Sequence, residues 1–200
     1  MKTVTRGEAA RILMNLGRVG VMPTDTVYGL VCRAQDKQAV SRLYSQKQRE
    51  NKPGTVIAAN VAQLVELGFK YRYVNAGEQF WPGPVSVVLP LGHDLKYLHL
   101  GKHSLAVRIT ADGELKALLE QTGPLLTSSA NHPGKPESET IDEAKAYFGD
   151  SVDFYVDGGD LSGRKPSTVI RIIDDAVEVL RQGAVKIDET TGRIIKNDIR

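Results

Sequence analysis

The sequence predicts an α/β fold built on a twisted, open sheet of parallel and antiparallel strands with flanking helices. Segments typical of helices and of strands alternate from one end of the 200-residue chain to the other, which is the pattern of layered α/β domains. Some strand segments, such as Val85–Leu89, are largely apolar and rich in β-branched residues, as expected for strands covered on both faces. Polar loops follow several strands, and ligands of α/β sheets collect at such strand ends.

Helices are predicted where a capping residue precedes apolar residues at helical spacing. Thr5 and Glu8 form a capping box before the first helix, which is expected to end at Gly17. Asp36 caps a second helix, whose buried side carries Ala39, Val40, Leu43 and Tyr44. Further helices are expected at residues 60–68, 71–80, 112–121 and 140–148.

Strands are predicted from short apolar or β-branched runs that end at turn residues. They cover residues 19–22, 55–59, 85–89, 105–109, 125–127, 152–156, 168–173 and 177–180. We expect the sheet to be parallel in its early part and antiparallel near its end, where Asp174 and Asp175 form a hairpin turn. Pro23 ends the first strand, so residues 23–30 are interpreted as a polar loop.

The amino-acid composition and net charge exclude several classes of protein. Lysine and arginine number 26 against 24 aspartate and glutamate, so the net charge of +2 excludes a protein that holds nucleic acid by bulk charge. Cys32 is the single cysteine, which excludes an intramolecular disulfide and a multi-cysteine zinc site. No apolar run approaches the length of a membrane span, and Met1–Arg6 leads into no signal-peptide core. We therefore expect a single cytoplasmic domain.

Several familiar catalytic signatures are absent. The sequence contains no P-loop, no dinucleotide-binding glycine fingerprint and no nucleophile elbow. Ser162 and Lys165 match the spacing of a serine acylase, but the surrounding glycines place them in a loop. His99 and His103 have the spacing of a helical metal pair, but Gly101 interrupts it. We expect the four histidines to be structural or exposed, and no protein-ligated metal.

Two segments offer polar groups to a small ligand. Residues 23–30 carry short hydroxyl side chains after a strand, although the aspartate and threonines could equally cap a turn. Lys47, Arg49 and Lys52 lie where the second helix gives way to a loop, and three cations so close together can hold a polyphosphate. The alternative is a solvated helix end whose cations complement the helix dipole.

Further polar groups occur near other strand ends. Residues 127–134 contain serine and asparagine side chains that suit a phosphate or a base edge, and a plain turn is the competing interpretation. Arg108 lies inside an apolar strand, where its charge must be exposed, paired or used on an anionic ligand, because burying it alone is costly. Residues 166–169 and 181–183 are weaker candidates.

Taken together and in this order, these segments resemble the YrdC/TsaC family of threonylcarbamoyl-AMP synthases. The family pattern reads Pro-Thr-Asp/Glu-Thr-Val-Tyr-Gly-Leu, Lys-x-Arg, Trp-Pro-Gly-Pro, Val-Arg, Ser-x-Asn, Ser-Thr-Val and Arg-x-Gly. In this chain it matches residues 23–30, 47–49, 81–84, 107–108, 129–131, 167–169 and 181–183. The resemblance implies a YrdC-like (YrdC/RibB-type) sheet with a concave ligand-binding surface.

The resemblance also implies that the chain joins L-threonine, bicarbonate or CO2, and ATP into L-threonylcarbamoyladenylate and pyrophosphate. A separate transferase complex would use the product to modify adenosine in tRNA. Threonine would be held by Thr26, Arg108 and Ser167. The ATP site would be lined by Lys47, Arg49, Lys52, Ser104, Ser129, Asn131 and Arg181, with Lys47 and Arg49 as catalytic cations. Mg²⁺ is expected to bind through the nucleotide phosphates.

The chain departs from the family pattern at three positions. Glu50 replaces a proline after the Lys-x-Arg segment, Gly54 replaces a common leucine, and Ile57 replaces a histidine found in some relatives. Longer relatives also carry a second C-terminal domain. Here residues 1–184 are expected to form the YrdC-like domain and residues 185–200 a short C-terminal extension.

Other functions stay open at this point. A divergent paralogue would keep the fold without the synthase activity. An RNA-binding module would use a basic patch of Arg42, Lys47, Arg49 and Lys52, and its affinity for RNA or tRNA would fall steeply with added salt. YrdC-like domains also occur in carbamoyltransferases, but those chains are much longer than this one.

Overall fold

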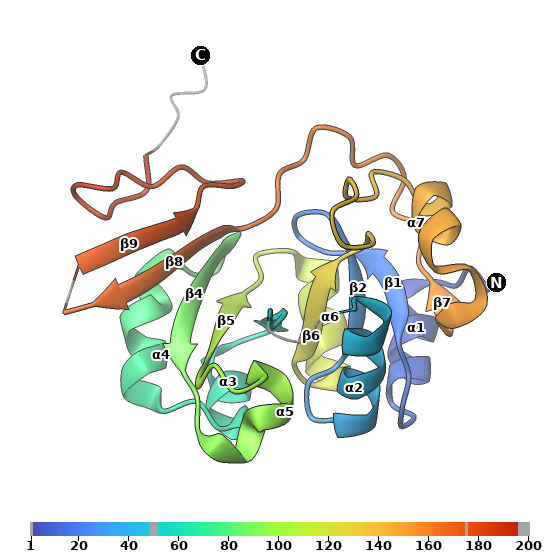
Figure 1. The fold of residues 1–200 in the computed structure, drawn as a ribbon, viewed down its shortest axis with the longest axis horizontal. Helices are drawn as coiled ribbons and strands as arrows, with labels where there is room; N and C mark the ends of the chain where they lie inside the picture. Colours follow the sequence, from blue (N-terminus) through green and yellow to red (C-terminus); the bar gives the residue numbers. More distant parts are fainter. Residues whose placement is uncertain (1, 49–51, 175, 196–200) are drawn as a thin grey trace.

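One mixed β-sheet between two layers of helices organises the computed structural model, which describes residues 2–48, 52–174 and 176–195 (Figure 1). The strands are β1 (Gly20–Pro23), β2 (Tyr28–Arg33), β3 (Thr55–Ala58), β4 (Val85–Pro90), β5 (Ser104–Ile109), β6 (Leu125–Ser129), β7 (Phe154–Tyr155), β8 (Thr168–Ile173) and β9 (Ala176–Arg181). The helices are α1 (Arg6–Leu13), α2 (Lys37–Gln46), α3 (Val61–Leu67), α4 (Tyr71–Gly77), α5 (Lys96–His99), α6 (Gly113–Thr122) and α7 (Ile141–Phe148). Short 3₁₀ turns lie at Glu78–Phe80, His93–Leu95 and Gly149–Ser151.

Helices α1, α2, α3, α6 and α7 begin where the sequence predicts, because their capping residues are in place, whereas α5 was not predicted and has no side-chain cap. Thr5 and Glu8 form the expected capping box, and the Asp36 carboxylate accepts two backbone N–H groups at the start of α2. The same kind of bond begins α3, α6 and α7. The first helix ends at Leu13, earlier than the predicted end at Gly17.

The sheet is mixed, as predicted, but its directions differ from the expectation. Within the described residues, nine strands lie in the order β7-β1-β2-β6-β3-β5-β4-β8-β9. The pairs β1–β7, β3–β5 and β4–β8 are parallel. The prediction of a parallel early part is wrong, since β1 and β2 are antiparallel. Residues 24–27 join them as a tight turn, whereas a parallel crossover needs about a dozen residues or more.

Strand β2 corrects the interpretation of residues 23–30 as a loop. Tyr28, Leu30 and Cys32 are fully buried, and β2 lies between β1 and β6. The polar residues 24–27 dominate the pattern and hide the apolar alternation that begins at Tyr28. The hairpin expected near Asp174 is present, because β8 and β9 pair antiparallel, while Asp175 lies outside the described residues.

Different helices cover the two faces of the sheet. On one face, α1 and α6 bury their apolar residues against Val31, Ile57 and Leu125. On the other, α2, α3, α4, α5 and α7 pack against a larger core that includes Val56 and Leu126. Ile57, where some relatives have histidine, is therefore a core residue of the first face. Both layers leave the ends of the central strands open to the loops drawn above them in Figure 1.

Small residues occupy these uncovered strand ends. Side chains two residues apart share one face of a strand. Gly29, Thr55 and Thr127 therefore lie on the same face of the sheet as the apolar residues that α1 and α6 cover. A Cβ at Gly29 would lie 2.5 Å from Thr127 Oγ1, and one at Gly54 would lie 2.6 Å from the Thr127 backbone oxygen. A Cβ at position 54 would therefore meet backbone rather than a movable side chain.

The described part of the C-terminal extension, residues 185–195, folds back onto the β8–β9 hairpin. Thr168 Oγ1 accepts N–H bonds from Gly183 and Val185 and donates to the Val185 carbonyl. Ile187 is only 1% exposed and belongs to the larger core. The extension therefore packs against the same body as the rest of the chain.

Candidate active site

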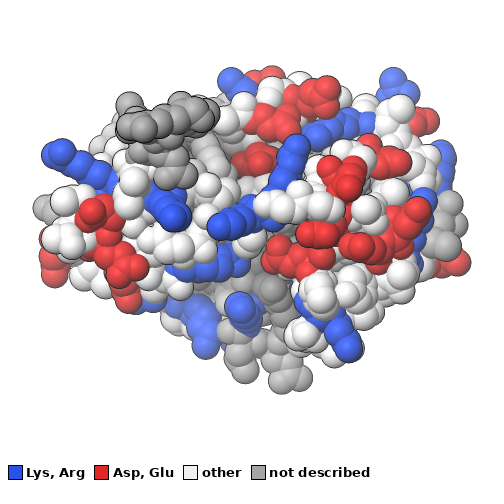
Figure 2. Space-filling view, turned by 90° about the horizontal axis from the view of Figure 1, so that it is seen from above, with Lys and Arg blue, Asp and Glu red and all other residues white. Residues whose placement is uncertain are grey.

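A cavity of about 710 Å³ lies over the uncovered ends of the central strands. Its walls come from the turn between β1 and β2, from the end of α2, from β3, β5 and β6, and from the β8–β9 hairpin. Figure 2 looks down on the loops at this end and shows lysine and arginine side chains across the middle of the face. The predicted site residues that line the cavity are Thr26, Lys47, Lys52, Arg108, Ser129, Asn131, Ser167 and Arg181.

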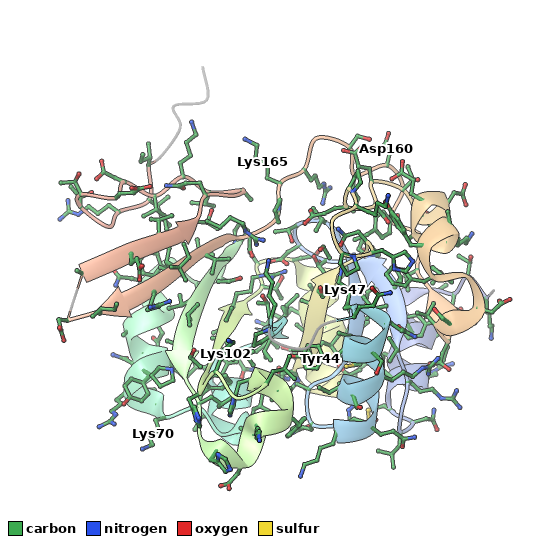
Figure 3. All side chains as sticks on the ribbon, in the orientation of Figure 1. Tyr44, Lys47, Lys70, Lys102, Asp160 and Lys165 are labelled. Carbon is green, nitrogen blue, oxygen red and sulfur yellow. The ribbon has the colours of Figure 1, made fainter. Side chains whose placement is uncertain are left out.

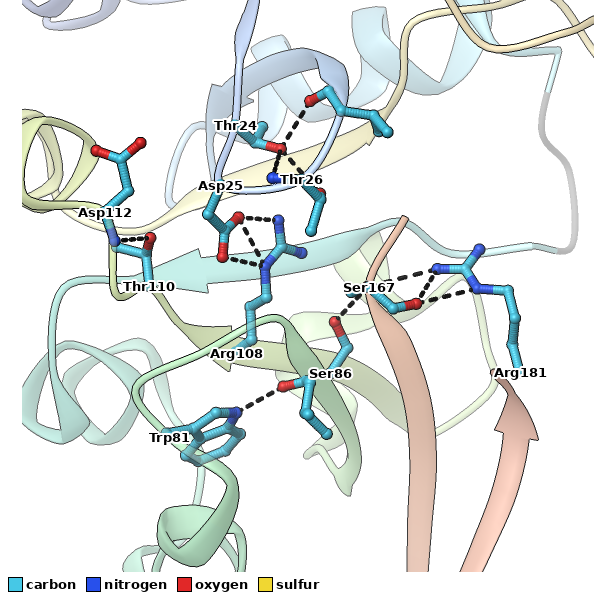
Figure 4. A network of polar contacts seen from close by, with 12 residues as sticks. Thr24, Asp25, Thr26, Trp81, Ser86, Arg108, Thr110, Asp112, Ser167 and Arg181 are labelled. Atoms are coloured by element: carbon cyan, nitrogen blue, oxygen red, sulfur yellow. Dashed lines mark hydrogen bonds and ion pairs between the residues drawn. The ribbon is translucent and has the colours of Figure 1, made fainter. Parts of the chain in front are cut away.

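Arg108 reaches the cavity from β5 and is paired with Asp25 from the β1–β2 turn (Figure 4). Its Nε donates to both carboxylate oxygens at 3.0 and 3.1 Å, and its Nη2 donates to Oδ1 at 2.5 Å. The two side chains are 3% and 7% exposed. The charge inside the strand is thus paired, and two-point contact fixes the plane of the guanidinium.

Thr26 lies beside this pair, in the same turn. Thr24 Oγ1 accepts the Thr26 N–H at 3.3 Å and donates to the Val27 carbonyl at 2.8 Å. The hydroxyls of Thr24 and Thr26 are 3.1 Å apart, and both side chains are buried in the cavity wall. The turn is therefore capped by Thr24, which leaves the Asp25 carboxylate for Arg108.

Ser167 and Arg181 form a second polar group on the opposite wall (Figure 4). Arg181 donates from Nε and Nη2 to the Ser167 carbonyl at 3.2 and 2.8 Å, and Ser86 Oγ donates to Ser167 Oγ at 2.9 Å. Burial lowers the pKa of Arg181; the Glu137 carboxylate opposes that shift, and the charge of Arg108 adds to it. An arginine remains a cation even so, which means the cavity holds two guanidinium charges that act on each other.

Lys47 is buried between the end of α2 and the end of β6 (Figure 3). Its ammonium donates to the Ser129 carbonyl at 2.8 Å, the Asn131 carbonyl at 2.5 Å and Asn131 Oδ1 at 2.7 Å. Ser129 Oγ donates to the same amide oxygen at 2.8 Å. The solvated helix end that the sequence left open is therefore wrong for Lys47.

The remaining predicted residues lie in different places. Lys52 is exposed and lines the cavity. Arg49 and Glu50 lie outside the described residues. Ser104 begins β5, where its Oγ donates to the Lys102 carbonyl at 3.4 Å, and the described lining of the cavity does not include it. Its contact with ATP therefore stays a prediction.

The suggested basic patch is not formed by Arg42 or Lys47. Arg42 donates to Asp153, to the Ser151 carbonyl and to the Gly17 carbonyl, and Lys47 is only 2% exposed. Their charges are thus engaged inside the protein rather than offered to a large polyanion.

Three residues in or behind the cavity wall were missed by sequence reasoning: Glu137 lines the cavity, while Asp25 and Ser86 bond to the lining residues Arg108 and Ser167. Asp25 was interpreted as a turn cap, although an acidic residue beside a buried arginine is its usual partner. Ser86 breaks the apolar run of β4, and that polar residue in a buried strand was the available signal. Glu137 lines the cavity but lies in a loop without a recognisable motif; nothing in the sequence marked it.

The histidines that attracted attention in the sequence have other surroundings. His99 is fully buried, its Nδ1 accepts N–H bonds from Gly101 and His103 at 3.1 Å, and its Nε2 lies 3.2 Å from the Gly92 carbonyl. Its role is structural.

No group of three histidine, cysteine or acidic side chains that could hold a metal occurs in the part of the chain that the structure describes. Within the same residues, no helix has the length and apolar character to cross a membrane.

Known proteins resemble this chain in sequence and in structure. The family model for Sua5, YciO and YrdC, described as telomere recombination, matches residues 13–183. A threonylcarbamoyl-AMP synthase of Marinobacter nauticus is 35% identical over 170 residues, which cover 82% of this chain and 90% of the relative.

Two solved structures share the fold. P. abyssi Sua5 complexed with L-threonine matches with a TM-score of 0.81 and 29% identity over 92% of this chain, which spans 56% of the Sua5 chain. E. coli YciO matches with a TM-score of 0.75 and 27% identity over 89% of this chain and 88% of its own. Since the sequence match extends through most of the chain and the fold is the same, this protein belongs to the Sua5/YciO/YrdC family.

Proposed function

We propose that this protein is a threonylcarbamoyl-AMP synthase, which joins L-threonine, bicarbonate or CO2, and ATP into L-threonylcarbamoyladenylate and releases pyrophosphate. The observation that carries the proposal is one cavity in which Arg108 and Arg181 lie on opposite walls, with lysines on a third side. Its volume of about 710 Å³ is within the range of ~300–1,000 Å³ typical of small-ligand pockets.

The threonine end of the site would be Arg108, Thr26 and Ser167. The guanidinium of Arg108 is already oriented by Asp25, so it would meet the substrate carboxylate without losing side-chain freedom. The hydroxyls of Thr26 and Ser167 line the same cavity and suit the polar groups of an amino acid. A solved structure of the related P. abyssi Sua5 contains L-threonine, which supports this assignment.

The ATP end would be Lys52, Arg181 and the Ser129–Asn131 loop, together with Lys47 and Arg49. Lys52 and Arg181 come from segments on different sides of the cavity, so their charges would converge on a bound polyphosphate. Arginine offers forked donors to phosphate oxygens, and lysine offers a point charge.

The chemistry needs positioned substrates and cations rather than a covalent nucleophile. The neutral threonine amine first adds to the carbon of CO2 and loses a proton, which gives a carbamate. A carbamate oxygen then attacks the α-phosphorus of ATP, and the bond to pyrophosphate breaks. Cationic groups placed where phosphoryl charge develops would lower the barrier, and holding both substrates in one cavity would supply the orientation.

Mg²⁺ is expected to enter with ATP. The described lining of the cavity contains a single carboxylate, Glu137, which fits an ion bound mainly through phosphate oxygens and water. When bound, the ion would neutralise phosphate charge, and Glu137 would be the carboxylate of the described lining available to hold it.

The proposed activity also indicates a downstream partner and a cellular location. The adenylate is a reactive mixed anhydride, so a separate tRNA threonylcarbamoyl transferase is the expected consumer. Since ATP and threonine are the substrates, we expect the protein in the cytoplasm. Direct tRNA binding would need exposed cations, and Lys165 on the loop above the cavity (Figure 3) is one available group.

The proposal is tested by incubating the purified protein with ATP, threonine and bicarbonate while leaving out each substrate in turn. We expect adenylate and pyrophosphate only with the full set, measured by mass spectrometry and a pyrophosphate assay. ATP binding without turnover would instead identify a divergent paralogue. RNA affinity that falls steeply with salt, with no response to ATP, would favour the RNA-binding alternative.

A further inference from the structure

Lys47 is a buried cation with three hydrogen bonds to one loop. An ammonium has three hydrogens, and among the described residues its acceptors are the carbonyls of Ser129 and Asn131 and the Asn131 side-chain oxygen, at 2.5 to 2.8 Å. The side chain is only 2% exposed. To bind a phosphate oxygen, Lys47 would have to give up one of these bonds.

The bonds fix the direction of the Asn131 amide and of the Ser129 hydroxyl. Because Nζ can only donate, the Asn131 amide must turn its oxygen toward Lys47, and its nitrogen then donates to the Lys135 carbonyl at 2.6 Å. Ser129 Oγ donates to the same Asn131 oxygen. Loss of the ammonium would therefore release the Asn131 amide and the Ser129 hydroxyl together.

The same bonds join two walls of the cavity. Lys47 is the C-cap of α2, whereas Ser129 ends β6 and Asn131 lies in the following loop. The loop is also tied by N–H bonds from Ala130 to the Tyr28 carbonyl and from Ser138 to the Ala130 carbonyl. Lys47 thus connects the loop to the end of α2.

We propose that Lys47 is a positioning residue. Its hydrogen bonds hold the Ser129–Asn131 loop in place, and it supports ATP binding through this loop rather than by contacting a phosphate. This differs from the role of catalytic cation that the family resemblance implies for Lys47. The proposal rests on the proposed function, in that the loop is taken to bind ATP.

The first test needs no substrate. Lys47→Met keeps a similar stem and removes the donors. In the ATP-free protein, we expect amide hydrogen exchange at Ala130 and Ser138 to become at least about tenfold faster, since charge-assisted hydrogen bonds of this kind are lost. Lys52→Met, an exposed lysine of the same cavity, is the matched control and should leave these two amides unchanged. Unchanged exchange in Lys47→Met would overturn the proposal.

The second test is a double-mutant cycle on ATP affinity, measured by calorimetry with Lys47→Met and Asn131→Ala. If Lys47 acts through the loop, its replacement costs far less affinity in the Asn131→Ala background than in the wild type. Equal losses in both backgrounds would mean an independent phosphate contact and overturn the proposal. Should Lys47→Met not fold, Asn131→Ala with Lys47 in place must itself show faster exchange at Ser138, and unchanged exchange would be the overturning result.

The two readouts separate this proposal from the proposed function. A wild-type protein that makes no adenylate would contradict the synthase activity, while the exchange measurement would still report whether Lys47 organises the loop.

Discussion

The pair of Arg108 and Asp25 is the residue-scale example of a charge that serves both the fold and the site. An arginine that is 3% exposed in a central strand would be costly without a partner, and the bidentate carboxylate removes most of that cost. The same contact orients the guanidinium at the cavity wall. Ser167 is also held by neighbouring side chains, because Ser86 donates to its hydroxyl and Arg181 donates to its carbonyl.

At this scale, Arg108→Lys should raise the KM for threonine at least about tenfold and change the KM for ATP much less. A lysine supplies one point charge where arginine supplies a rigid fork, and a lost charge-assisted bond is worth about 1.5–3 kcal/mol. Steady-state kinetics with each substrate varied in turn checks the prediction.

Arg42→Lys is the matched control for that variant. Arg42 also pairs with an aspartate, Asp153, but the described lining of the cavity does not include it. Its replacement should leave both KM values unchanged. An equal rise of the two KM values in Arg108→Lys would show that Arg108 only supports the structure.

At the scale of elements, α2 is anchored at both ends by buried polar groups. The Asp36 carboxylate accepts N–H bonds from Gln38 and Ala39 and from Gly17 before β1, and Lys47 ties the other end to β6. Asp153, just before β7, joins the same region by accepting bonds from Arg18, Arg42 and the Val19 N–H. The helix is thus held to strands that lie far from it in sequence.

Asp153 should make stability depend on pH. Burial raises the pKa of Asp153, but the Val19 N–H and the guanidinium groups of Arg18 and Arg42 outweigh it and hold the pKa below its ordinary value. A carboxyl whose pKa is lowered on folding stabilises the protein above its unfolded pKa of about 4, and this contribution is lost as pH falls through the folded pKa.

Thermal unfolding of Asp153→Asn across the pH range checks this expectation. The variant should unfold at a lower temperature than the wild type at pH 7, and the difference should shrink as the pH falls below about 4. Asp142→Asn is the control, because its side chain is 88% exposed and pairs with Lys145 one turn along α7; such a surface pair contributes little. A pH-independent difference for Asp153→Asn would contradict the assignment.

At the scale of the whole molecule, two helical layers cover the sheet unevenly and leave the cavity at one end. The C-terminal extension belongs to this body, since Ile187 is buried in the larger core while Ile194, which bridges to it, is 41% exposed. The family model ends at residue 183. The chain therefore closes its core with residues beyond the shared family region.

Ile187→Ala should destabilise the protein by about 2–5 kcal/mol, because it removes a fully buried side chain and leaves a cavity. Ile194→Ala should cost much less. Urea denaturation of both variants checks the difference, and equal small losses would show that the extension is not part of the folded core.

Much of the fold was predictable because its signals are local. Thr5, Asp36 and Thr140 begin helices through bonds to backbone groups within three residues, and such contacts are visible in a sequence. The direction of β2 could not be predicted in this way, since it depends on the tight turn at residues 24–27 and on pairing with β6. In the site, the cations and hydroxyls were predictable as motif members, but Glu137 carried no local signal.

The family, most helix starts, most buried strand segments and the polar segments of the site could be predicted from the amino-acid order, because each is a pattern of neighbouring residues or of ordered motifs. Which polar side chains pair across the site depends on the folded arrangement of the strands. Asp25 holds Arg108 across 83 positions of the chain, and Lys47 holds Asn131 across 84. Such pairs follow from the order of strands in the sheet and from the need to satisfy each buried charge, and neither is written in local spacing.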